Sequence, residues 1–174
     1  MKNVLKYSIR DEVLYGSLGG VSYSMTAYSG GGRGSTAGME RRDLDHWRTQ
    51  KKAPDSFSAT NRGGPLPVGM YLVKYFGIHE HLGRCAILMQ TISSLVYADP
   101  WSPVGVSVTE RSEFFIHGRG PKGSDGCIVP GKDSDLKSLL DALKRETSVV
   151  ALFVQNDGVN VDRFGVSNFF KHAA

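Results

Sequence analysis

Short apolar runs that are rich in β-branched and aromatic residues recur along this chain, and Gly, Pro or Asp-Gly turns separate them. Runs of this length and composition, bounded by turn residues, are typical of β-strands. At residues 63–69 the prolines preset φ and the glycines admit positive φ, which predicts a rigid turn. We expect strands in residues 4–14 (one or two, around an Asp11-Glu12 turn), 21–28, 70–76, 83–94 and 148–155, a turn at 16–20 and a loop over 96–108.

A helical pattern occupies residues 133–146, and a shorter helix is expected over residues 39–51. Asp133 or Ser134 is a suitable N-cap for the first of these helices. Four leucines spaced i, i+3, i+4 and i+7 give it one apolar face: Leu136, Leu139, Leu140 and Leu143. The chain has 174 residues, 40% of them hydrophobic, which is enough for a real core. We therefore interpret residues 1–174 as a single β-rich α+β domain.

The segment FFIHGRGPKGSDGCIVPG, residues 114–131, combines the residue types that a catalytic thiol needs. Such a thiol requires a base, a backbone that exposes the sulfur, and N–H donors for an oxyanion. His117 follows an apolar run, and Cys127 follows Gly126, whose missing side chain lets a substrate carbonyl approach the backbone. Glycines between them let the chain turn back, so that the imidazole and the thiol could meet. A buried, inert cysteine in a glycine-rich loop explains the same residues, and spacing alone leaves both interpretations open.

The order HG then SDGC, at residues 117–118 and 124–127, resembles the active-site signature of the L,D-transpeptidases, the YkuD-like catalytic domain. Asp125 stands where those enzymes usually carry a histidine, and Ile128 stands where an arginine commonly follows the cysteine. The short loop is more similar to the compact branch of this superfamily that type VI secretion delivers. Other pieces similar to that branch are Tyr28-Ser29-Gly30, residues 64–71 (GPLPVGMY) and residues 111–118 (RSEFFIHG), so the resemblance covers about residues 28–129.

This resemblance implies an L,D-transpeptidase-like mixed β-sandwich or partial barrel with one or two flanking helices. It implies that Cys127 is the nucleophile and His117 its base, with no cofactor. The implied reaction removes or exchanges the terminal D-Ala of peptidoglycan tetrapeptide stems, as an L,D-carboxypeptidase or an L,D-transpeptidase. An antibacterial effector that acts in the periplasm of a target bacterium is also implied, with a cognate immunity protein and a secretion component as partners. The implied site further includes an oxyanion loop of Gly118, Ser124, Asp125 and Gly126, and Tyr28 and Arg111 for substrate binding.

Two other functions stay open from the residues alone. A papain-like peptidase or amidase would use the same cysteine chemistry, although such enzymes usually place the cysteine before the histidine and at the start of a helix. A binding or structural module without enzymatic activity would need no activated thiol, and rapid alkylation of Cys127 at neutral pH would argue against it.

The net charge of +4 and the pI of about 9.1 are mildly basic, and no nucleic-acid-binding motif accompanies them. Lys6 and Arg10 interrupt any apolar stretch near the N-terminus, and no run approaches the length of a membrane span. We therefore expect synthesis in the cytoplasm without a signal peptide and export by another route.

The remaining cysteine and histidine residues have structural explanations. Cys85 lies in an apolar, strand-like run and is expected to be reduced and buried. His79 and His81 flank Glu80 in an expected turn, but no suitable third ligand is near them in the sequence. No metal site is therefore predicted.

Overall fold

The computed structural model describes residues 3–31, 65–98, 106–108, 112–118 and 124–155. Its strands are β1 (Val4–Ser8), β2 (Val13–Leu18), β3 (Val21–Ser29), β4 (Gly69–His79), β5 (Gly83–Gln90), β6 (Val96–Ala98), β7 (Val106–Val108), β8 (Phe114–His117), β9 (Ile128–Pro130) and β10 (Val150–Gln155). Its helices are α1 (Ile92–Leu95) and α2 (Asp133–Arg145).

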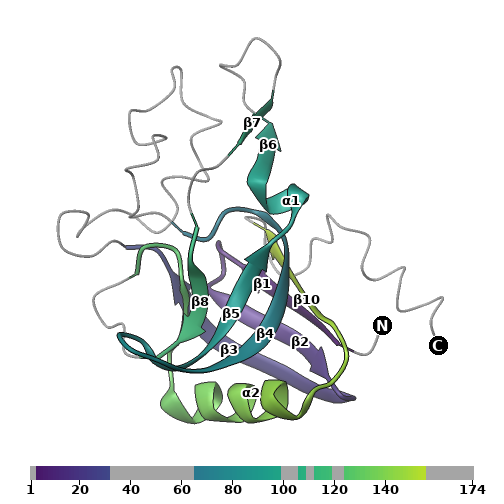
Figure 1. Ribbon diagram of the computed structural model, residues 1–174, viewed down its shortest axis with the longest axis vertical. Coiled ribbons are helices and arrows are strands. Elements are labelled where there is room, and N and C mark those ends of the chain that lie inside the picture. The colour runs from purple at the N-terminus through teal and green to yellow at the C-terminus, as the bar shows by residue number, and fades with distance from the viewer. Residues whose placement is uncertain (1–2, 32–64, 99–105, 109–111, 119–123, 156–174) are drawn as a thin grey trace.

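Eight strands of the described residues form one closed barrel, in the order β1-β10-β4-β5-β8-β9-β3-β2 (Figure 1). The pairs β1–β10 and β8–β9 are parallel, and the other neighbouring pairs are antiparallel. Strands β6 and β7 form a separate antiparallel ribbon, and Figure 1 shows α2 across the end of the barrel opposite that ribbon. The predicted fold class, a β-rich mixed sheet with a flanking helix, is confirmed.

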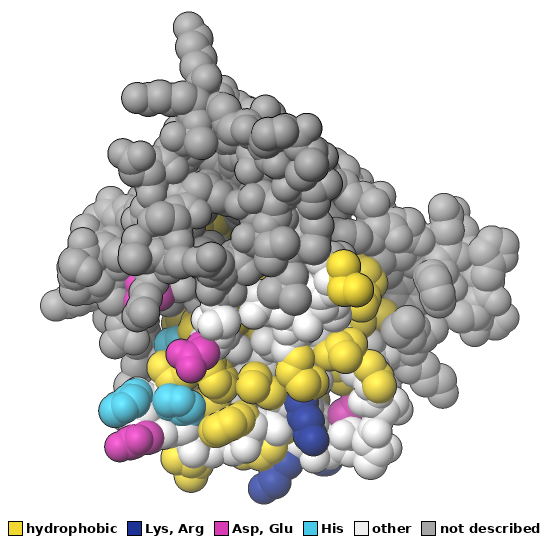
Figure 2. Space-filling view, turned by 45° about the horizontal axis from the view of Figure 1, so that its top comes forward, with side chains coloured by type: hydrophobic (Ala, Val, Ile, Leu, Met, Phe, Trp, Pro, Cys, Tyr) yellow, Lys and Arg dark blue, Asp and Glu magenta, His cyan; other side chains and the backbone are white. Residues whose placement is uncertain are grey.

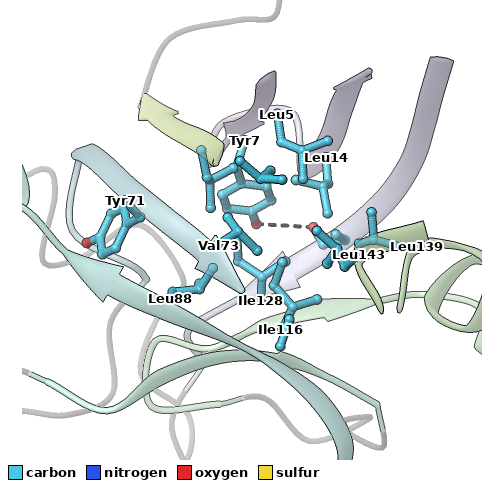
Figure 3. Close-up of a cluster of buried hydrophobic side chains, with 14 of the residues drawn as sticks. Leu5, Tyr7, Leu14, Tyr71, Val73, Leu88, Ile116, Ile128, Leu139 and Leu143 are labelled. Carbon is cyan, nitrogen blue, oxygen red and sulfur yellow. Dashed lines mark hydrogen bonds between the residues drawn. The ribbon is translucent and has the colours of Figure 1, made fainter. Parts of the chain in front are cut away.

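Alternate residues of the strands fill the barrel interior, as the period of two in a β-strand requires. Tyr7 lies at its centre and donates a hydrogen bond from its hydroxyl to the carbonyl oxygen of Ala27, at 3.1 Å (Figure 3). Each fully buried aliphatic side chain contributes about 1.5–3 kcal/mol relative to an exposed one. Around Tyr7 are Leu5, Leu14, Val73, Leu88, Ile116, Ile128, Leu139 and Leu143.

Helix α2 closes one end of this core with the predicted apolar face. Leu139, Leu140 and Leu143 are buried, and Leu136 packs at the edge of the core. The predicted N-cap is wrong, because the helix begins at Asp133 and the cap position is Lys132, which makes no capping hydrogen bond with its side chain. Acidic residues in the first turn favour this helix terminus instead, through the positive end of the helix dipole.

Several predicted boundaries also differ from the structure, most clearly at three places. Residue Gly16 belongs to β2 and pairs with Leu5, so the turn is confined to Gly19 and Gly20. The strand predicted over residues 83–94 ends at Gln90, because α1 follows. The predicted loop over 96–108 contains β6 and β7. The helix expected over residues 39–51 lies outside the described residues.

Within the described residues, no helix is long and apolar enough to span a membrane.

Asp141 of α2 pairs with two cations, one on the barrel and one on its own helix. Its carboxylate accepts hydrogen bonds from Arg84 of β5, at 2.6 Å, and from Lys137 one turn earlier in α2, at 2.9 Å. Arg84 also donates from Nε to the hydroxyl of Tyr75 in β4, at 3.1 Å. The bonds from Lys137 and Arg84 lower the pKa of Asp141 from 3.8 to about 2.

Replacing Asp141 by asparagine should therefore destabilise the fold in a pH-dependent way. A carboxyl whose pKa is lowered on folding contributes stability above its unfolded pKa and loses it as the pH falls. The melting temperature of Asp141→Asn should lie below that of the unmodified protein at neutral pH, and the difference should shrink as the pH falls from 3.8 towards 2. The exposed Glu80→Gln variant serves as a control. A difference that stays constant with pH would contradict this role of the ion pairs.

Candidate active site

Strands β8 and β9 place the two halves of the HG and SDGC motif side by side. They run parallel, and Ile116 pairs with Ile128, both fully buried in the barrel. Because side chains alternate between the faces of a strand, His117 and Cys127 share the face away from the barrel core. Cys127 directly precedes β9, so extending this register by one residue places it opposite Phe115 and diagonal to His117. Because the two strands run parallel, the connection between them is not a tight hairpin, and the expectation that the imidazole and the thiol meet stays a prediction.

The hydroxyl of Ser124 organises the turn that carries Cys127. It accepts hydrogen bonds from the N–H of Gly30, at 3.1 Å, and from the N–H of Gly126, at 3.4 Å, and donates to the carbonyl oxygen of Cys127, at 2.7 Å. The N–H of Ser124 donates to the carbonyl oxygen of Gly30, at 2.9 Å. Gly126 has φ of +115°, a conformation that favours glycine. The sequence between Ser124 and Cys127 is therefore a hydrogen-bonded turn attached to the end of β3.

A second hydroxyl, that of Ser29, holds the same turn from the barrel side. It donates to the carbonyl oxygen of Gly126, at 2.9 Å, and accepts from the N–H of Leu66, at 2.8 Å. Three pieces of sequence that are far apart in the chain therefore meet here: residues 28–30, residues 65–71 and residues 124–127. The sequence alone gives no sign of this role for Ser29, because an isolated serine carries no information about its partners in space.

The imidazole of His117 is buried, with 3% of its surface exposed. Its Nδ1 lies 2.6 Å from the carbonyl oxygen of Gly118. A carbonyl can only accept, so Nδ1 carries the proton of the neutral ring and Nε2 is left as the basic nitrogen. This backbone carbonyl is therefore in position to orient the imidazole.

The thiol of Cys127 is half-buried, and its Sγ lies 3.9 Å from the carbonyl oxygen of Glu113, just before β8. Glu113 has φ of +62°, which is uncommon for a residue with a side chain. On the same side of the sheet, the ring of Phe115 packs against the rings of Phe76 and His79, with centroids 5.6 Å and 5.2 Å apart. Phe115, Phe76 and His79 thus form an aromatic cluster on this face of the sheet. Figure 2 shows histidine side chains next to hydrophobic ones on one face of the molecule.

A cleft of about 580 Å³ opens at the other end of β8. His117 and Gly118 line it, and the rest of its wall comes from the β4–β5 turn and the first turns of α2. Cys127 is not among the described residues that line this cleft.

The remaining residues predicted for the site are Tyr28, Asp125, Arg111 and Gly126. Tyr28 pairs with Val129 in the β3–β9 ladder, which puts it on the same face as Cys127. Asp125 is half-buried at the bend before Gly126. Arg111 lies outside the described residues. The N–H of Gly126, one of the expected oxyanion donors, is directed at the Ser124 hydroxyl, at 3.4 Å.

The second cysteine and the turn histidines are separate from this arrangement. Cys85 is buried and reduced, and burial raises the pKa of its thiol, opposed by a backbone hydrogen bond from His79. His81 lies in the exposed β4–β5 turn, with its Nε2 3.9 Å from the carboxylate oxygen Oε2 of Glu80. Across the described ranges, no three His, Cys, Asp or Glu side chains are grouped so that they could hold a metal ion.

Neither a protein-family model nor a curated protein sequence matches the chain. Among solved structures, it is similar to the L,D-transpeptidase of Xylanimonas cellulosilytica, with 15% identity and a TM-score of 0.42 over 88% of this chain and 60% of that one. It is also similar to L,D-transpeptidase 1 of Mycobacterium tuberculosis, with 18% identity and a TM-score of 0.41 over 88% of this chain and 61% of that one. A third similar structure is Bd1075 of Bdellovibrio bacteriovorus, with 13% identity and a TM-score of 0.49 over 98% of this chain and 56% of that one.

Similarities at this level concern the fold and carry over no activity. The chain also spans only about three fifths of the length of these structures. The function has to be argued from this chain's own site.

Proposed function

We propose that the chain is a cysteine-dependent enzyme that acts on the tetrapeptide stems of peptidoglycan. The observation that carries the proposal is that His117 ends β8 beside the turn that leads into β9, and that two buried hydroxyls hold this turn and the Cys127 that follows it. The motif resemblance described above supplies the substrate class.

In the proposed reaction, Nε2 of His117 takes the proton of the Cys127 thiol. The sulfur then attacks the carbonyl carbon that links the third stem residue to the terminal D-Ala. The N–H of Cys127 stabilises the oxyanion that forms. When the tetrahedral intermediate collapses, the C–N bond breaks, the imidazolium gives its proton to the leaving amine, and a thioester remains. Water releases the acyl group in an L,D-carboxypeptidase, and a D-amino acid releases it in an exchange reaction.

The position of Cys127 also bears on the papain-like alternative. Papain-like enzymes carry their cysteine at the start of a helix, whereas Cys127 directly precedes strand β9. A peptidase of that kind is therefore the weaker candidate.

On the motif resemblance alone, we extend the proposal to an antibacterial effector that acts in the periplasm of another bacterium. Its partners would be a cognate immunity protein and a component of the secretion machinery. An assay of the purified chain tests the chemistry independently of these partners.

Mass spectrometry of purified muropeptides incubated with the protein tests the proposal. We expect tetrapeptide stems to lose their terminal D-Ala, or to carry a new D-amino acid when one is added. Activity should persist in EDTA, because the proposed nucleophile is a thiolate and not a metal-bound water. Muropeptides that stay unchanged with and without D-amino acids would overturn the proposed function, and EDTA-sensitive activity that zinc restores would overturn the thiol mechanism.

A further inference from the structure

The hydroxyl of Ser29 binds the one peptide unit that contains the proposed oxyanion donor. Ser29 is the last residue of β3, and only 2% of its surface is exposed. Its hydrogen bond ends on the carbonyl oxygen of Gly126, at 2.9 Å. That carbonyl and the N–H of Cys127 belong to the same planar peptide unit, and in a trans peptide they point in opposite directions. Whatever holds the carbonyl therefore sets the direction of the N–H.

A glycine precedes this peptide unit, which makes its orientation easy to change. Gly126 has φ of +115° and lacks a Cβ, so rotation of the following peptide meets little steric resistance. The Ser124 hydroxyl binds the Gly126 N–H and the Cys127 carbonyl, which belong to the peptide units on either side. Of these contacts, the Ser29 bond is the one made to the peptide between Gly126 and Cys127.

The Ser29 hydroxyl is itself held in place. It accepts from the N–H of Leu66, at 2.8 Å, so its single proton is directed at Gly126. Leu66 is fully buried and follows Pro65, which restricts the backbone at this point. The bond to Gly126 is therefore anchored to the barrel core.

We infer that Ser29 is a positioning residue that directs the Cys127 N–H towards the oxyanion of the reaction. The inference rests on the proposed function. It gives Ser29 no contact with substrate: the residue acts through the Gly126–Cys127 peptide. Because the oxyanion exists only along the reaction path, loss of the Ser29 hydroxyl should lower kcat and leave KM nearly unchanged.

The test compares Ser29→Val with Ser29→Thr in the muropeptide assay. These side chains have nearly the same shape and both suit a strand, so they differ mainly in the hydroxyl. We expect kcat of Ser29→Val to fall about 10- to 100-fold, since loss of one oxyanion donor costs about 100- to 1,000-fold. Ser29→Thr should keep most of the activity. Ser24→Ala, which removes an exposed hydroxyl from the same strand, is the control.

Alkylation of Cys127 by iodoacetamide provides a second measurement. This reaction forms no oxyanion, so Ser29→Val should be alkylated at nearly the rate of the unmodified protein while its kcat falls. Peptide mapping distinguishes Cys127 from the buried Cys85.

Equal kcat values for the valine and threonine variants would overturn the inference while leaving the proposed function intact. So would a parallel loss of alkylation and kcat, or failure of Ser29→Val to fold, because each result would make the role of Ser29 structural. Absence of turnover by the unmodified protein would instead reject the proposed function.

Discussion

Alanine at Cys127 or at His117 is expected to abolish turnover of muropeptides, by roughly 1,000-fold or more in kcat. The first change removes the atom that forms the thioester. The second removes the nitrogen that takes the thiol proton and later protonates the leaving amine. Because each residue is useless without the other, the double variant should be no slower than the slower single variant. Initial rates from mass spectrometry, measured with the melting temperature of each variant, give both quantities.

Matched controls exist for both residues. Cys85→Ala removes the buried cysteine, and His81→Ala removes an exposed histidine of the β4–β5 turn. Both should retain turnover, with Cys85→Ala losing some stability because it leaves a space in a packed region. Turnover by Cys127→Ala close to that of the unmodified protein would rule out thioester chemistry at this residue. Additive losses in the double variant would show that the two residues do not act as a pair.

Gly16→Ala is expected to cost about 3–5 kcal/mol of folding free energy. Gly16 lies within β2 at φ of +138°, and a Cβ there would stand 2.2 Å from the carbonyl oxygen of Val4 and 2.9 Å from the Cα of Leu5. Both atoms belong to the backbone of β1, so no side chain can move aside to make room. Urea denaturation followed by circular dichroism measures the loss.

Gly20→Ala is the matched control for backbone conformation. Gly20 also has positive φ, at +86°, but no atom lies within 4 Å of the position of a new Cβ. We expect this variant to lose about 1–2 kcal/mol, the cost of a left-handed conformation alone. Similar losses for the two variants would mean that the close approach of β1 to Gly16 contributes nothing to the effect.

Local patterns in the sequence were sufficient for most elements of the fold. The runs of β-branched and aromatic residues became strands, and the leucines at helical spacing became the buried face of α2, because burial of one face imposes its period on the sequence. Boundaries were less accurate. Gly16 read as a turn residue, although its place in a strand depends on the close approach of β1, which no local pattern records.

The candidate site shows the same division between local and distant information. The residue types and order in HG and SDGC were enough to propose His117 and Cys127, since a thiol mechanism needs a base and a glycine-flanked cysteine. The carbonyl of Gly118 at the imidazole and the hydroxyl of Ser29 at Gly126 could not be read from the sequence. A serine hydroxyl or a backbone carbonyl is chemically identical at every position, and only its neighbours in space give it a role.

The sequence by itself determined the approximate positions of most strands, the buried face of the long helix, and which side chains could carry acyl-transfer chemistry. Only the tertiary structure decided that β1 pairs with β10 to close the barrel, that β8 and β9 run parallel, and that Ser29 meets the turn before Cys127. Side-chain periodicity reports burial within one strand. The partner and direction of each strand depend instead on how all the strands together satisfy their backbone hydrogen bonds around one core.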